Sequence, residues 1–108
     1  MLMVRETFIN ESKGYQFGES DWYEPWTDDR GKLFRDYRKE FGACKSRVYI
    51  DTAKGTKPVG WVFSRRERYD DARSKADTYI REVWVEVKEV LDPADVHGAP
   101  YEMEEVGL

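Results

Sequence analysis

The spacing of apolar and polar residues is most regular from the middle of the chain onward, where it predicts three β-strands. In residues 46–52, Val48 and Ile50 alternate with more polar residues, which is typical of a half-buried strand. Residues 58–66 and 78–89 are rich in valine and aromatic side chains, the composition of paired strands, and a polar connector joins them. We therefore expect a three-stranded antiparallel meander built around one long hairpin.

A longer period predicts one amphipathic helix over residues 28–42. Four apolar residues recur on one side of it, namely Leu33, Phe34, Tyr37 and Phe41. Thr27 supplies a capping side chain, and Asp28 and Asp29 supply acids at the positive end of the helix dipole. Gly42 is suited to end the helix. The basic residues of this segment fall mainly on the remaining surface; they are Arg30, Lys32, Arg35, Arg38 and Lys39.

The two ends of the chain have weaker patterns. In residues 1–27 we expect an additional edge strand, followed by a loop that contains Tyr15, Phe17, Trp22, Tyr23 and Trp26. These rings either hold the loop against the domain or, in one or two cases, anchor a partner. Residues 92–108 lose the periodicity and are expected to form an irregular acidic tail.

Together these elements predict a single α+β domain over residues 1–108, with one amphipathic helix packed on a small antiparallel sheet. A chain of 108 residues is long enough to bury one core. In the hairpin, Trp61 and Phe63 share one face and Val62 lies on the other, while Trp84 lies opposite the valines of its strand. We expect the helix to cover one face of the sheet and the aromatic loop to cover the other.

The net charge of −4 is unevenly distributed. Residues 30–75 hold 14 basic and 6 acidic side chains, whereas the segments on both sides are acidic. The basic middle either attracts the acidic ends within the fold or forms a nucleic-acid surface. Cys44 is the only cysteine, which fits a reducing compartment, and neither a signal peptide nor a membrane span is visible. We expect a cytoplasmic protein that does not contact a membrane.

Few residues are suited to catalysis. Zinc sites and serine–histidine–aspartate chemistry would depend on His97, the only histidine, in a predicted loop. Cys44 has no identifiable base beside it. The acidic pairs are sequence neighbours, whose side chains point apart on an extended chain; they are Asp28–Asp29, Asp70–Asp71 and Glu104–Glu105. We expect no enzyme, no cofactor and no metal site, with a carboxylate or Cys44 site as the remaining alternative.

Residues 59–69 combine basic and aromatic side chains, as a surface for single-stranded nucleic acid requires. The residues that would contact nucleic acid are Arg65, Arg66, Arg68 and Tyr69. However, Arg65 and Arg66 point to opposite sides of a strand. Salt bridges to Glu82 or Glu86 across the hairpin would explain these arginines equally well. Nucleic-acid binding is therefore the alternative function.

Gly-Trp-Val-Phe at residues 60–63 and Glu-Val-Trp-Val at residues 82–85 belong to a pattern that extends over residues 30–92. This pattern resembles small accessory proteins of actinobacteriophages, particularly those of mycobacteriophages. The resemblance implies expression inside a bacterial host and a role in host take-over, immunity or counter-defence. It implies no site residues.

The sequence therefore favours a non-catalytic accessory protein that binds another protein, with a host protein as the partner. Aromatic side chains commonly anchor such interfaces. Those expected to bind the partner are Trp22, Tyr23, Trp26 and Trp84. An exposed strand edge in so small a sheet would also allow a homodimer.

Overall fold

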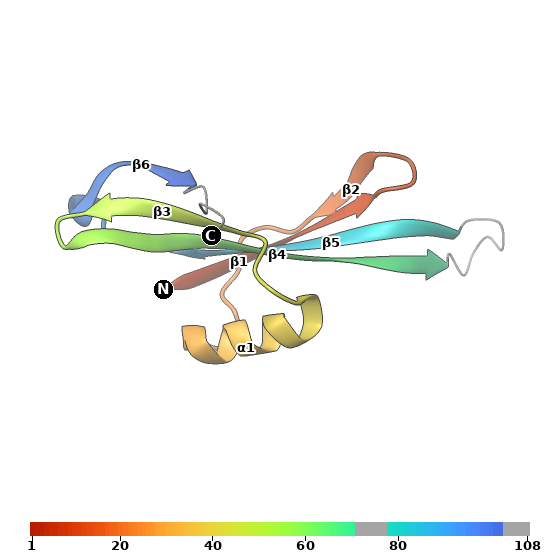
Figure 1. Cartoon of the computed structure of the whole chain (residues 1–108), viewed down its shortest axis with the longest axis horizontal. Helices are drawn as coiled ribbons and strands as arrows, with labels where there is room; N and C mark the ends of the chain where they lie inside the picture. Colours follow the sequence, from red (N-terminus) through yellow and green to blue (C-terminus); the bar gives the residue numbers. More distant parts are fainter. Residues whose placement is uncertain (71–77, 103–108) are drawn as a thin grey trace, which may run out of the picture.

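The computed structural model describes residues 1–70 and 78–102, which form one helix and a six-stranded sheet (Figure 1). The strands are β1 (Leu2–Asn10), β2 (Tyr15–Glu19), β3 (Ser46–Thr52), β4 (Gly55–Asp70), β5 (Thr78–Glu89) and β6 (Val96–Glu102). The helix α1 spans Arg30–Phe41, and a short 3-10 turn, η1 (Pro93–Asp95), precedes β6. No helix in this part of the chain is long and apolar enough to cross a membrane.

Neighbouring strands run antiparallel, in the order β2-β1-β5-β4-β3-β6. The long strands β4 and β5 lie at the centre and pair from Gly60 beside Lys88 to Asp70 beside Thr78. β1 and β2 extend the sheet beyond β5, and β3 and β6 extend it beyond β4. The predicted hairpin is therefore the centre from which the sheet extends in both directions.

The predicted α+β architecture, with one helix on an antiparallel sheet, is confirmed, but the three-stranded meander is too small. β3 and β5 occupy the predicted residues 46–52 and 78–89, while β4 extends beyond the predicted 58–66 at both ends. The sheet also includes β1, β2 and β6.

β1 is an interior strand and not the predicted edge strand. Leu2 and Val4 are buried, so β1 lies beneath the helix and has a neighbour on each side. Its outer neighbour is β2, which is formed by part of the expected aromatic loop. The Phe17 ring of β2 packs 6.1 Å from the rings of both Phe8 and Tyr79, measured between centroids. This packing attaches β2 to the sheet.

The predicted irregular tail, residues 92–108, is also corrected, because its first part is ordered as η1 and β6. The Asp92 side chain caps η1, which lets the chain return along β3. The Tyr101 hydroxyl then donates a hydrogen bond to Asp51 on β3 at 2.8 Å. Most β6 side chains are exposed, so this strand lacks the apolar alternation that reveals strands in a sequence. Residues 103–108 lie outside the described part.

The ends of α1 have hydrogen-bonded caps. The Asp29 carboxylate accepts a hydrogen bond from the backbone nitrogen of Lys32 at 3.2 Å and forms the N-cap. Gly42 adopts a φ of +83° just after the last turn, a conformation that favours glycine. The helix begins after the predicted start because Asp28 accepts a hydrogen bond from the Leu2 backbone at 2.8 Å instead.

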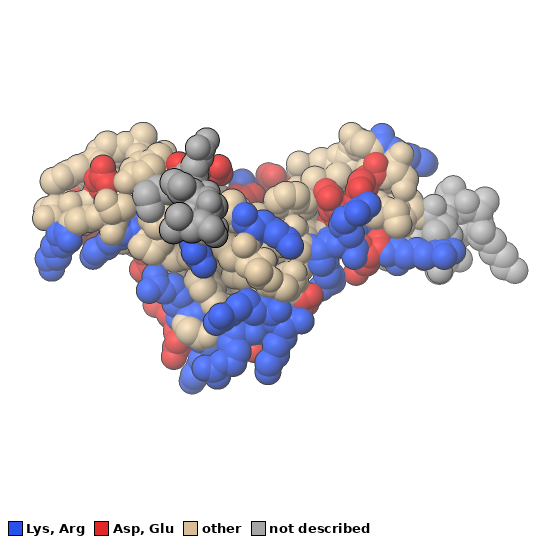
Figure 2. Space-filling view, in the orientation of Figure 1, with Lys and Arg blue, Asp and Glu red and all other residues tan. Residues whose placement is uncertain are grey.

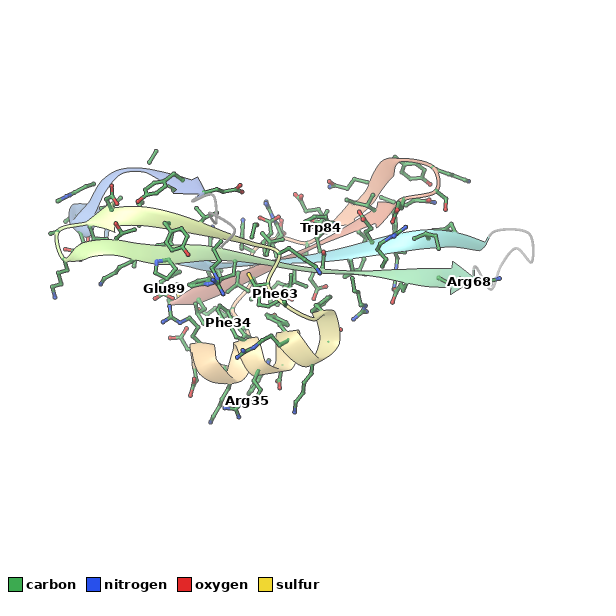
Figure 3. All side chains as sticks on the ribbon, in the orientation of Figure 1. Phe34, Arg35, Phe63, Arg68, Trp84 and Glu89 are labelled. Atoms are coloured by element: carbon green, nitrogen blue, oxygen red, sulfur yellow. The ribbon has the colours of Figure 1, made fainter. Side chains whose placement is uncertain are left out.

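The apolar side of α1 packs on one face of the sheet and forms the core (Figure 3). The Phe34 ring lies 4.9 Å from the Trp61 ring and 5.6 Å from the Phe63 ring, and Tyr37 lies 5.4 Å from Phe63, all between centroids. These separations are typical of favourable aromatic pairs. The other buried residues of the core are Leu2, Val4, Leu33, Phe41, Val83, Val85 and Val87.

The opposite, helix-free face of the sheet carries Val62 and Trp84, as the alternation predicts. Figure 1 shows that β2 and β6, at the two edges, bend away from the helix side of the sheet. The segment expected to form a covering loop contributes Trp22 to this face, where the ring contacts Arg5 and Lys88. The two faces of the sheet are therefore covered to different extents.

Phe63→Ala should lower the free energy of unfolding by about 3–5 kcal/mol, because it leaves a cavity in the core. The Phe63 ring is 1% exposed. Phe17→Ala is the matched control, since this ring is 44% exposed and stacks at the sheet edge; its loss should stay below about 1.5 kcal/mol. Urea unfolding followed by circular dichroism measures both. Equal losses would contradict the assignment of the helix–sheet contact as the main core.

Candidate functional site

The helix-free face carries an apolar groove of about 530 Å³. β3, β4 and β5 form its floor, β6 and η1 line one side, and Trp22 lines another. Further apolar residues along it include Val48, Val62, Leu91, Val96 and Pro100. In Figure 2 the outline of the molecule dips on this side, between β6 and β2. The groove is a concave surface that the helix leaves uncovered.

Gly60 shapes the floor of this groove. A Cβ atom at position 60 would lie only 3.1 Å from the Cβ atom of Val48 on β3, which is closer than ordinary contact. Because glycine has no such atom, Val48 packs directly over the β4 backbone. The floor can therefore be both closely packed and apolar.

Trp22 is held at the groove by two cations. The guanidinium carbon of Arg5 lies 4.6 Å from the centre of the indole ring, and the ammonium nitrogen of Lys88 lies 4.0 Å from it. These are favourable cation–π distances. Arg5 also donates hydrogen bonds to both carboxylate oxygens of Glu86, at 3.1 and 3.0 Å. The indole is thereby fixed while it remains half-exposed.

The charged residues at the groove have partners within the chain. Glu86 pairs with Arg5, and Glu89 accepts a hydrogen bond from the terminal ammonium of Met1 at 3.1 Å. That hydrogen bond raises the pKa of the terminal ammonium group. Lys88 lies against Trp22. The groove therefore offers apolar contact with its nearby charges largely compensated.

Of the four aromatic residues predicted to bind a partner, two lie on the helix-free face. Trp22 lines the groove, whereas Trp84 lies beside Thr7 and Ser64 and is not among the lining residues. The Trp84 indole nitrogen donates a hydrogen bond to Glu82 at 3.2 Å. Figure 3 shows Trp84 on the side of the sheet away from the helix.

The other two predicted residues lie elsewhere. Tyr23 projects to the helix side, where its hydroxyl donates a hydrogen bond to Glu6 at 2.8 Å. Burial, together with this carboxylate, raises the pKa of Tyr23. Trp26, in the segment before α1, is 67% exposed. The structure therefore does not gather the four predicted aromatic residues into one surface.

The arginines predicted to bind nucleic acid are divided between the two faces of β4. Arg65, on the helix side, pairs with Glu40 and Glu67 and lies over the Phe41 ring. The pKa of Arg65 is raised mainly by its hydrogen bond to Glu40, and the negative charges of Glu67 and Glu40 raise it further.

Arg66 is on the helix-free side and donates two hydrogen bonds to Glu11, at 2.7 and 2.6 Å. The salt bridges predicted with Glu82 or Glu86 are therefore corrected for Arg65 and Arg66, because Arg65 pairs with Glu40 on α1 and Glu67 on β4, and Arg66 pairs with Glu11. Arg68 also has an interaction partner. The side chain of Tyr69 lies outside the described part.

The candidate catalytic side chains are dispersed. Cys44 donates its thiol hydrogen to the carbonyl oxygen of Ser46 at 3.0 Å and packs beside the core. His97 is exposed on β6, across from Asp51 on β3. Within residues 1–70 and 78–102, no three histidine, cysteine or acidic residues are grouped to hold a metal ion. The Asp70–Asp71 and Glu104–Glu105 pairs lie outside the described side chains.

Sequence reasoning missed most of the groove. The alternation placed Val62 on the correct face, but nothing indicated that this face would stay open. Leu91, Val96 and Pro100 belong to the segment after β5, whose exposed residues carry no periodic signal. The contact between Trp22 and Lys88 joins distant parts of the chain and has no local signature.

No protein-family model, curated protein or solved structure matches this chain. The interpretation of the groove therefore rests on its own geometry.

The raised pKa of Tyr23 predicts an alkaline loss of stability. The folded protein holds the hydroxyl proton more tightly than the unfolded chain does. This stabilisation is therefore fully present below the ordinary tyrosine pKa of about 10 and is lost as the pH rises above it. In urea unfolding between about pH 8 and pH 11, Tyr23→Phe should lose less stability than the wild type.

The decrease should not vanish in Tyr23→Phe, because burial also raises the pKa of Tyr37 to about 12. Tyr15→Phe is the matched control, since Tyr15 is 49% exposed at the sheet edge. It should keep the wild-type slope. A Tyr23→Phe variant with the wild-type slope would show that the hydrogen bond to Glu6 does not hold the proton.

Proposed function

We propose that this protein is a non-catalytic binding domain whose groove accepts an apolar segment of another protein. The observation that carries the proposal is an exposed apolar concavity with a fixed tryptophan on its side. Exposed apolar surfaces of this kind mark interaction sites, and tryptophan is enriched among the residues that dominate binding energy.

The charges around the groove favour an apolar occupant. Glu86 and Glu89 already have cationic partners in the chain, and Lys88 is engaged with Trp22. A highly charged ligand would have to compete with these contacts, whereas an apolar segment would leave them in place. Because Trp22 is already held by two cations, little side-chain freedom is lost on binding.

The biological setting of this proposal comes from the resemblance to actinobacteriophage accessory proteins. The resemblance implies the cytoplasm of an infected bacterium as the location and a host protein as the partner. Binding to that protein would serve host take-over, immunity or counter-defence. The proposal needs no cofactor and no catalytic group.

Trp22→Ala should weaken partner binding about 30-fold or more, which corresponds to the 2 kcal/mol typical of a dominant interface residue. The partner is first isolated by affinity capture from a nuclease-treated actinobacterial lysate. It is then purified, and its affinity for each variant is measured by calorimetry. Trp26→Ala is the matched control, because this exposed ring lies outside the groove, and it should bind like the wild type.

Leu91→Glu provides a second test that does not depend on Trp22. Leu91 lines the groove between β5 and η1 and is partly exposed, so a carboxylate there should be compatible with folding. It should weaken binding because it places a charge in an apolar site. If a captured partner bound Trp22→Ala and Leu91→Glu as tightly as the wild type, the groove would not be the binding site.

A further inference from the structure

The side of the molecule opposite the groove carries a concentration of positive charge. Lys32, Arg35, Arg38 and Lys39 lie on the exposed surface of α1; we call these four residues the basic helix surface. Figure 2 shows blue side chains gathered over α1, and in Figure 3 Arg35 points away from the sheet. The surface therefore faces solvent on the side away from the groove.

Among the residues that the structure describes, these four cations differ from the arginines of the sheet because no carboxylate pairs with them. Within the part of the chain that the structure describes, none of the four side chains forms an ion pair or a hydrogen bond. By contrast, Arg5, Arg65 and Arg66 each pair with a carboxylate. Over residues 1–70 and 78–102, the positive charge of these four helix residues is therefore not paired with carboxylates, unlike that of Arg5, Arg65 and Arg66.

The acidic residues of α1 leave the basic strip continuous. Lys32, Arg35 and Lys39 are spaced by three and four residues, so they lie along one side of the helix. Asp36 falls beside this strip, and Glu40 is engaged with Arg65 on β4. With a rise of about 1.5 Å per residue, the strip is about 10 Å long.

We propose that the basic helix surface binds the phosphate backbone of double-stranded DNA, independently of base sequence. Lysine and arginine are the main donors to phosphate oxygens, and such contacts need no apolar anchor. This site is separate from the groove. The basic helix surface lies on the opposite side of the sheet, and it would bind phosphate groups instead of an apolar segment.

The composition of the surface distinguishes duplex DNA from other polyanions. None of the four residues that form it is aromatic, so they offer no ring for stacking unpaired bases, which single-stranded nucleic acid would require. The major groove of B-form DNA admits an α-helix, whereas the narrow major groove of duplex RNA does not. Protein–protein interfaces are depleted in lysine and have apolar residues at their centre. The basic helix surface instead contains two lysines and no apolar residue.

Binding is tested with a fluorescently labelled DNA duplex of mixed sequence, by anisotropy at a series of salt concentrations. Each neutralised phosphate contributes about −0.9 to the slope of log affinity against log salt, so four contacts predict a slope of about −3.6. Arg35→Gln with Lys39→Gln should reduce the slope to about −1.8 and weaken binding at low salt. Both substitutions suit a helix, and the melting temperature checks folding.

Lys13→Gln with Lys54→Gln is the matched control, because it removes the same charge from exposed turns of the sheet. This control should keep the wild-type slope, and so should Trp22→Ala. The latter result would separate the DNA site from the groove. Loss of partner binding with DNA binding intact, or the reverse, distinguishes failure of one proposal from failure of the other.

Three results would overturn the DNA proposal. One is the absence of any anisotropy change at about 50 mM salt and the highest soluble protein concentration, where counterion release favours binding. Another is equal weakening by the control pair and the helix pair, which would indicate an effect of net charge alone. The third is binding of polyglutamate, single-stranded DNA or duplex RNA as tight as that of the DNA duplex.

Discussion

The packing of α1 on β4 is the interaction on which the rest of the structure depends. Phe34 and Tyr37 contact Trp61 and Phe63, the residues that β4 presents on one face at the centre of the sheet. This contact buries the apolar sides of the helix, β1, β4 and β5 at the same time. Because a single helix of 12 residues covers only part of one face, the opposite face and the outer surface of the helix both remain available.

These two remaining surfaces differ in whether their basic side chains are paired with carboxylates. On the sheet, carboxylates on neighbouring elements compensate Arg5, Arg65 and Arg66, which leaves apolar contact as the main property of the groove. On the helix, Lys32, Arg35, Arg38 and Lys39 form no ion pair in the part of the chain that the structure describes, and their positive charge faces solvent. Within the basic middle of the chain, Arg65 and Arg66 are thus neutralised by nearby carboxylates, whereas the cations of the helix face solvent.

The sequence predicted the elements whose signals are local. The helix could be predicted from its apolar period and its C-terminal glycine, and β3 and β5 from their alternation, because each residue's neighbours along the chain decide these patterns. β6 could not be read, since an exposed edge strand has no buried side to produce alternation. The groove could not be predicted either, because Trp22, Val62 and Val96 come together only after the strands have assembled into the sheet. The same limit applied to the arginine partners, such as Glu11 for Arg66.

The interior position of β1 has a consequence for how the chain folds. β1 pairs along its length with β5, so that Arg5 meets Glu86 across 81 positions of sequence. Closing so long a loop costs conformational entropy before the contacts that repay it can form. During synthesis β1 must remain unpaired on this side until β5 has left the ribosome. The β4–β5 hairpin is more local, which makes it the natural template onto which β1 is added.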